Sequence, residues 1–196
     1  MLHLPRLTLL GALLLLAGCS GDRDEQTSPA DYDTVNFSGR ISSLGIPAAQ
    51  LEGNWRGPSG AIYDDFYDLD SLPAIQQSMA EPLKKLMVPF GIRASGDFIY
   101  INPDDPGSIV TLSVFQFDSA TQCDAYWKLR YVDTPEAPLL NEVANSPYRA
   151  VDQKSEGLYK RHAAFGNILL TAHQLRPGDE HIRVLERYAK HIHESQ

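Results

Sequence analysis

The sequence predicts an α+β fold in which helices cover an antiparallel sheet built from hairpins. Two pairs of strand-like segments, 98–117 and 158–175, lie between helical patterns, and Gly166-Asn167 joins the second pair as a two-residue turn. Strands and helices do not alternate regularly, as they would in a parallel α/β sheet. We therefore expect one antiparallel sheet with helices packed against it.

Residues 35–70 are broken into short pieces by seven glycines and prolines between positions 39 and 60, which indicates brief strands and turns. Trp55 and the pair Ile62-Tyr63 are candidate core residues, because aromatic side chains among turn residues usually pack inward. Ser59 lies in a Gly-Pro-Ser-Gly turn, but it lacks the G-x-S-x-G spacing and the following helix of a hydrolase nucleophile. We interpret Ser59 as a polar turn residue.

From Ser71 the pattern becomes helical until Pro89. Pro82 interrupts this pattern, so we expect a kink or two shorter helices. The apolar residues recur at intervals of three and four, and they are Leu72, Ile75, Met79, Leu83 and Leu86. Strands are predicted next at Phe98–Ile101 and Ile109–Phe117, followed by a helix from Asp118-Ser119 to about Val132.

Residues 133–147 contain three prolines and are predicted to form a loop, with a helical turn at Leu139–Ala144. A strand at Tyr148–Val151 precedes the second hairpin, Leu158–Phe165 and Ile168–Leu175. Its two-residue turn makes the numbers of facing residues sum to 333, which places Leu170 on a buried face. The last helix begins at Asp179, with one apolar stripe formed by Ile182, Leu185, Ala189 and Ile192.

The 196-residue chain has 25 acidic and 17 basic side chains, for a net charge of −8. An acidic chain repels nucleic acid, and Lys84-Lys85 and Lys160-Arg161 are isolated pairs that form no basic patch. We therefore exclude nucleic acid as a partner. The length suits one domain with a single main core, which we expect to be monomeric.

Acidic residues and histidines are the candidate metal ligands. The acidic cluster Asp64, Asp65, Asp68 and Asp70 invites a calcium hypothesis, but it lacks the regular D-x-D-x-D-G run, so a solvated turn with Asp70 capping the next helix is favoured. In the hairpin register His162 and His173 become diagonal neighbours, yet zinc needs three or four ligands and Lys160 opposes a cation. We therefore interpret the pair as part of an exposed polar face.

The remaining candidates also favour structural roles. His181, His191 and His193 are placed on or beside the polar side of the last helix. Cys123, in a helical pattern beside Tyr126 and Trp127, is interpreted as a buried inert thiol; its place near a helix start leaves a reactive thiol as the alternative. We predict no catalytic residue, no metal ligand and no cofactor.

The start of the chain carries one positive side chain, Arg6, followed by an apolar run from Leu9 to Leu16 that is too short to span a bilayer. The run ends in Leu16-Ala17-Gly18-Cys19, which resembles the lipobox of bacterial lipoproteins. That resemblance implies cleavage before Cys19 and lipid attachment to it. Residues 1–18 are then a signal peptide, 19–34 a polar flexible tether and 35–196 a globular domain.

The order of elements over residues 90–193 resembles the PsbP/Mog1-like domains of small exported lipoproteins, a resemblance that carries no functional residue across. Ser20 after the cysteine resembles the pattern of lipoproteins sent to the outer membrane, where the domain would face the periplasm. We therefore expect a noncatalytic binding or accessory module of the cell envelope. Its expected partners are the membrane through the lipid anchor and an unknown envelope protein or small ligand. The alternatives are a hydrolase with residues assembled from separate loops, or a carrier of a small apolar ligand.

Overall fold

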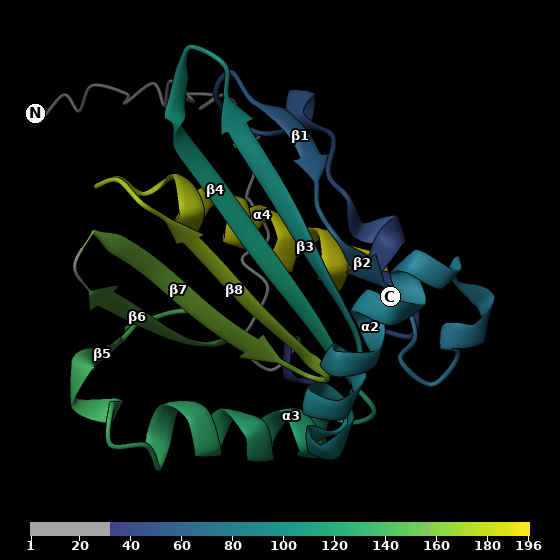
Figure 1. The fold of residues 1–196 in the computed structure, drawn as a ribbon. Helices are drawn as coiled ribbons and strands as arrows, with labels where there is room; N and C mark the ends of the chain where they lie inside the picture. The colour runs from purple at the N-terminus through teal and green to yellow at the C-terminus, as the bar shows by residue number, and fades with distance from the viewer. Residues whose placement is uncertain (1–31, 156) are drawn as a thin grey trace, which may run out of the picture.

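The computed structural model describes residues 32–155 and 157–196. In this part of the chain eight strands form one antiparallel sheet in the order β1-β3-β4-β8-β7-β6-β5, with β2 paired to β3 (Figure 1). The strands are β1 Arg56–Ser59, β2 Ile62–Tyr63, β3 Ile92–Asn102, β4 Asp105–Phe117, β5 Leu140–Glu142, β6 Arg149–Ser155, β7 Leu158–Phe165 and β8 Ile168–Gln174. The helices are α2 Ala74–Met87, α3 Ala120–Trp127 and α4 Glu180–Glu194. The predicted α+β fold is confirmed.

The hairpin of β7 and β8 has the predicted register. Lys160 faces His173 and His162 faces Thr171 across the two strands. The side chain of Asn167 in the turn accepts a hydrogen bond from the Phe37 amide (2.8 Å) and donates to the carbonyls of Phe37 (2.9 Å) and Phe117 (3.1 Å). The turn therefore also holds the start of the described chain against the end of β4.

The two faces of the sheet carry different elements. Figure 1 shows α4 behind the sheet and α2 and α3 in front of it. The core on the α4 side includes Phe98, Leu112, Leu170 and Leu185, together with residues from the irregular segment 32–51. The core on the other side packs Cys123 and Trp127 of α3 against Phe117 and Leu169.

A buried tyrosine pair joins α4 to the sheet and to the first segment. The hydroxyls of Tyr100 and Tyr188 lie 2.6 Å apart. Tyr100 also donates to the carbonyl of Ile46 (2.7 Å), and the Ile46 amide donates to Tyr188 (3.2 Å). Because both rings are fully buried, these bonds satisfy polar atoms that would otherwise be costly inside the core.

The globular part begins earlier than the sequence indicates. Tyr32, placed by prediction in the tether, is buried with its ring against Tyr148 and Phe165. Tyr32 therefore belongs to the globular part, because burial of its ring removes apolar surface from water. Residues 1–31, with the predicted signal peptide and Cys19, lie outside the described residues.

Helix α2 differs from its prediction in two respects. It is a single helix through Pro82, so of the two expected outcomes, a kink or two shorter helices, the second is wrong. Proline removes only one amide donor there, while Leu83 and Met87 beyond it pack against the second core. Its apolar stripe is only partly buried, because Leu72 and Leu83 pack against the second core whereas the other three stripe residues face outward. Ile75, Met79 and Leu86 are 76%, 56% and 64% exposed.

Two further local predictions can be compared with the structure. Ser119 caps α3 by accepting the Gln122 amide, and the helical path continues to Val132 as a π-helical turn, as predicted. The helical turn predicted at Leu139–Ala144 is wrong. Residues 140–142 form strand β5 instead, because they pair with β6. Within the described residues every helix is too short or too polar to cross a bilayer.

Candidate functional site

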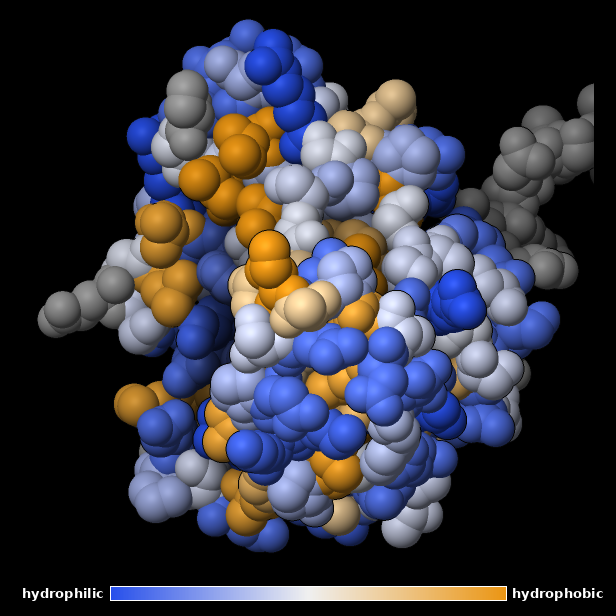
Figure 2. Space-filling view, turned by 45° about the vertical axis from the view of Figure 1, so that its right-hand side comes forward, coloured by the Kyte–Doolittle hydropathy of each residue, from blue (hydrophilic) through white to orange (hydrophobic). Residues whose placement is uncertain are grey.

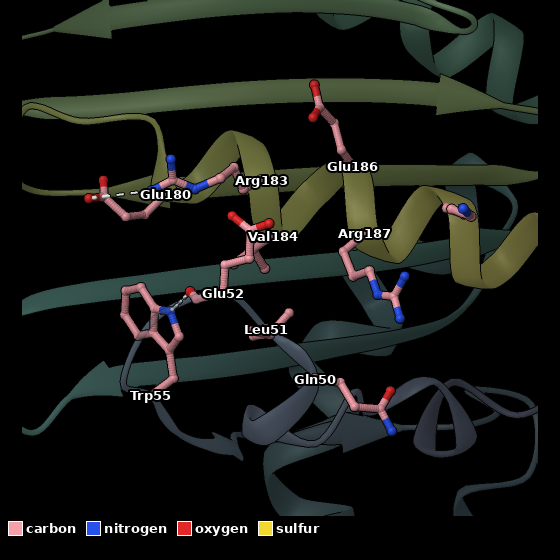
Figure 3. Close-up of a pocket in the computed structure, with 10 residues that line it drawn as sticks. Gln50, Leu51, Glu52, Trp55, Glu180, Arg183, Val184, Glu186 and Arg187 are labelled. Atoms are coloured by element: carbon pink, nitrogen blue, oxygen red, sulfur yellow. Dashed lines mark hydrogen bonds and ion pairs between the residues drawn. The ribbon is translucent and has the colours of Figure 1, made fainter. Parts of the chain in front are cut away.

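A hollow of about 500 Å³ lies between residues 50–55 and α4 (Figure 3). Its apolar floor is formed by Leu51 and Val184, which are both buried. Trp55 forms one side, and charged side chains of α4 form the other (Figure 3). The full lining is Gln50, Leu51, Glu52, Trp55, Glu180, Arg183, Val184, Glu186, Arg187 and Lys190.

Trp55 is held in place by the short loop before it. Its indole Nε1–H donates to the carbonyl of Glu52 (2.7 Å). Gly53 between them has φ of +106°, and a Cβ there would come within 2.9 Å of the same indole nitrogen. A glycine is therefore required for this loop conformation.

Most charges lining this pocket pair with neighbours. Arg183 lies 3.0 Å from the carboxylate of Asp179, Glu186 3.5 Å from Arg161, and Lys190 3.8 Å from Glu194. Of the charged side chains that line the pocket, Glu52 and Arg187 have no ion-pair partner in the described part of the chain. They stand on opposite walls, Glu52 beside Trp55 and Arg187 on α4 (Figure 3). The pocket therefore offers an apolar floor, an indole, one free carboxylate and one free guanidinium to a ligand.

A second hollow, of about 630 Å³, lies on the opposite side of the sheet beside α2. Figure 2 shows it as a recess between the lobe of the β3–β4 hairpin and the apolar surface at the centre of the view. Helix α2 contributes only apolar residues, and the sheet contributes one carboxylate, Asp97, which accepts a hydrogen bond from Ser113 (2.6 Å). The lining is Ala61, Tyr63, Met79, Pro82, Leu83, Met87, Ser95, Asp97, Ser113 and Phe115. The carrier hypothesis would use this groove.

The predicted histidine pair is not an exposed polar face, because His162 is 6% exposed. Tyr131, from the turn that follows α3, covers it, with its hydroxyl 3.0 Å from His162 Nδ1. The hydroxyl of Thr171 lies 2.9 Å from the same nitrogen. Burial, with smaller contributions from Lys160 and Arg130, lowers the pKa of His162 to about 4. His162 is therefore a neutral core residue at neutral pH.

His181 also departs from its prediction. The sequence predicts it on the polar side of the last helix, yet it is buried, and its amide donates to the Gln174 side chain (2.9 Å). Burial lowers the pKa of its imidazole. His193 is half-buried with its ring 4.7 Å from that of Tyr32. Because α4 packs against both the sheet and the segment that precedes it, its buried face is wider than the four-residue stripe indicated.

The acidic cluster is divided among separate contacts. Asp64 accepts bonds from the amide (2.7 Å) and hydroxyl (2.6 Å) of Ser42, and Asp65 pairs with Arg93 (2.9 Å). Asp70 does not cap α2, because the residue before the helix is Pro73 and no side-chain cap is formed. Across residues 32–155 and 157–196, no three His, Cys, Asp or Glu side chains are grouped as metal ligands.

Cys123 is the buried thiol that the sequence predicts. Its Sγ lies 3.4 Å from the carbonyl of Ile168. Burial raises the pKa of the thiol to about 12, so it stays protonated at neutral pH. The alternative of a thiol made reactive by the start of α3 is therefore wrong, because its pKa is raised and not lowered.

Trp55 packs against the edge of the main core, as the sequence predicts, and its place in the lining of the pocket is the feature that the sequence does not indicate. The available signal was the spacing of Arg183, Arg187 and Lys190, which recur at intervals of four and three on one side of α4. That spacing predicts a basic helix edge. It does not show that residues 50–55 lie against it, because this contact is not local in sequence.

No family model matches the sequence, and no curated protein matches it. Among solved structures the chain is similar to the extracellular domain of PknH from Mycobacterium tuberculosis. That similarity has 14% sequence identity and a TM-score of 0.43, and it covers 83% of this chain and 97% of the other. It is too distant to carry a functional conclusion.

Proposed function

We propose that the protein is a lipid-anchored lipoprotein of the cell envelope whose domain is a noncatalytic binding module. The observation that carries this proposal is the apolar run that ends in Leu16-Ala17-Gly18-Cys19, followed by the polar residues 20–31. Several acyl chains on Cys19 would hold the domain durably at a membrane, since a single chain binds only marginally. Ser20 after the cysteine supports the outer membrane, with the domain facing the periplasm.

The pocket between residues 50–55 and α4 is the proposed binding site. Its floor and Trp55 offer contact to an apolar or aromatic group, and Arg187 and Glu52 offer opposite charges at the two walls. This arrangement suits a ligand that carries both charges around an apolar body, such as a peptide segment of an envelope protein. Neither hollow gathers two or more histidines, and their carboxylates are dispersed, so a hydrolase is the weaker hypothesis.

The anchor is tested by replacing each cysteine in turn. Cys19→Ala is expected to abolish incorporation of labelled palmitate and to release the protein from washed membranes. Cys123→Ala is the matched control, because this buried thiol is unavailable for modification, and it should leave both results unchanged. Mass spectrometry showing an unmodified Cys19 in the mature protein would contradict the proposal.

The membrane in which the lipoprotein resides, inner or outer, is tested with Ser20→Asp. On the proposed outer-membrane address, a density gradient should place the wild-type protein in the outer-membrane fraction and move the variant to the inner-membrane fraction. Recovery of the wild-type protein in the inner membrane would exclude the outer-membrane location but would not contradict the lipid anchor.

The pocket is tested by photo-crosslinking in cells. A photoreactive residue replacing Gln50, at the pocket edge, should give a discrete adduct, and the same residue replacing exposed Lys154 should not. Adding Arg187→Gln should remove most of the adduct, because it removes the unpaired cation. An adduct that is insensitive to Arg187→Gln would contradict this site.

A further inference from the structure

Helix α2 carries an apolar edge that the rest of the described chain leaves uncovered. Ile75, Met79 and Leu86 are 76%, 56% and 64% exposed, and the only fully buried residue of the helix is Ala80. At 100° per residue these three side chains and Pro82 fall within one narrow stripe. A stripe of this kind is distinct from the single exposed apolar residues that are common on protein surfaces.

The rest of α2 completes an amphipathic pattern. Its charged residues, Glu81, Lys84 and Lys85, lie away from the stripe, and the helix carries one more positive than negative charge in a chain whose net charge is −8. Phe90, just beyond the helix, is 45% exposed and contacts Tyr126 edge to face. Apolar residues on one side, lysines on another and an aromatic residue at the end are typical of a helix that lies in a membrane interface.

The end of α2 lies close to the point where the described chain begins. The Asp118 amide donates to the carbonyl of Gly91 (2.8 Å), directly after the helix and its short extension. The Phe117 amide donates to Asn167 (2.8 Å), whose own amide donates to Val35 (3.3 Å). Residues 32–35 and residues 88–91 therefore share one end of the sheet.

The length of chain before Tyr32 limits how far this end can lie from the anchor. Twelve residues separate Cys19 from Tyr32, and such a segment spans at most about 45 Å fully extended, with a root-mean-square reach of roughly 20 Å when flexible. Helix α2 has 14 residues, which corresponds to about 21 Å. The whole apolar edge is therefore within reach of the bilayer that would hold Cys19.

We infer that α2 rests on the surface of the phospholipid membrane to which the chain is anchored. The inference depends on the proposed lipid anchor at Cys19. Ile75, Met79 and Leu86 would enter the boundary between headgroups and acyl chains, and Lys85, about a quarter turn around the helix from this stripe, would lie near headgroup phosphates. Because α2 and α4 cover opposite faces of the sheet, the pocket beside Trp55 then opens away from the membrane.

The test places an environment-sensitive fluorophore, NBD, at Leu86→Cys in the mature lipidated protein, reconstituted into vesicles of phosphatidylethanolamine and phosphatidylglycerol. Leu175→Cys is the matched control, because Leu175 is 61% exposed but follows β8, outside α2. Labelling is selective, since the thiol of Cys123 is buried and Cys19 is modified. Ile75→Cys provides a second position on the stripe.

At positions 86 and 75 the emission should shift to the blue and gain about twofold in intensity on reconstitution, and doxyl-labelled lipids should quench it. At position 175 the emission should stay that of a label in water. Water-like emission at 75 and 86 in vesicles that carry the protein would overturn the inference and leave the anchor intact. Failure of the protein to float with the vesicles would overturn the anchor, and the inference with it.

Discussion

The two faces of the sheet use amphipathic helices in opposite ways. Helix α4 buries Leu185, Tyr188 and Ile192 completely, and its tyrosine is bonded to the sheet and to Ile46. Helix α2 buries only Ala80 completely and leaves the larger apolar residues of its stripe exposed. An apolar helical stripe therefore does not by itself show that the helix buries that stripe in the protein's own core.

The largest expected effect is on the α4 face. Leu170→Ala removes a fully buried side chain from the core and should lower the free energy of unfolding by about 2 to 5 kcal/mol. Leu86→Ala, on the exposed edge of α2, should change it by less than about 0.5 kcal/mol. Denaturant melts of the two variants compare the faces directly, and equal losses would mean that α2 belongs to the folding core.

The second effect is a pH dependence on the α3 side of the sheet. The pKa of His162 is lowered from 6.5 to about 4, so its stabilising contribution is complete above pH 6.5 and is lost as the pH falls to about 4. Over that interval the unfolded chain binds a proton that the folded chain does not, which costs about 3 kcal/mol.

His162→Gln should lower the stability at pH 7 and flatten its dependence on pH between 6.5 and 4. Melts at pH 7, 5.5 and 4 measure this. A variant whose stability falls with acidification as steeply as that of the wild type would show that another group is responsible.

A smaller effect is expected for the other hairpin histidine. His173 is half-buried, so His173→Ala should cost on the order of 0.5 kcal/mol, far less than Leu170→Ala. Denaturant melts at pH 7 decide this comparison. A loss of unfolding free energy comparable with that of Leu170→Ala would show that the side chain of His173 also supports the core.

The smallest expected effect is that of a chelator. The structure groups no three metal-ligand side chains in residues 32–155 and 157–196, and the acidic residues near Asp64 bond to protein groups. EDTA should leave the melting temperature unchanged. A decrease of several degrees would reveal a metal that stabilises the fold.

Local patterns were sufficient to predict the antiparallel class of the sheet and its two hairpins, but not strand β5, where a helical turn was expected. The Gly166-Asn167 turn determined the β7–β8 register, and Ser119 marked the start of α3. Burial of single polar residues could not be predicted in the same way. Alternation placed His162 correctly on the face opposite Leu170, but only the position of Tyr131 shows that this face is covered there.

The candidate site was less predictable than the fold. Trp55 and Arg187 are separated by more than 130 residues and meet because residues 50–55 pack beside α4. No local motif records that contact. The exposed edge of α2 was also beyond prediction, since periodicity places Leu83 in one stripe with Ile75, Met79 and Leu86. Only the packing of the helix shows that Leu83 meets the core while the other three side chains stay exposed.

Hydrogen exchange measured by mass spectrometry tests the contrast between the two faces most directly. In the mature chain with Cys19→Ala, free in solution, amides of α2 should exchange about a hundredfold faster than those of α4, because few core contacts hold α2. In the lipidated protein on vesicles, α2 should slow markedly while α4 stays unchanged. Equal protection of both helices in solution, or exchange in α2 that does not respond to the membrane, would contradict the assignment of one face to folding and the other to membrane contact.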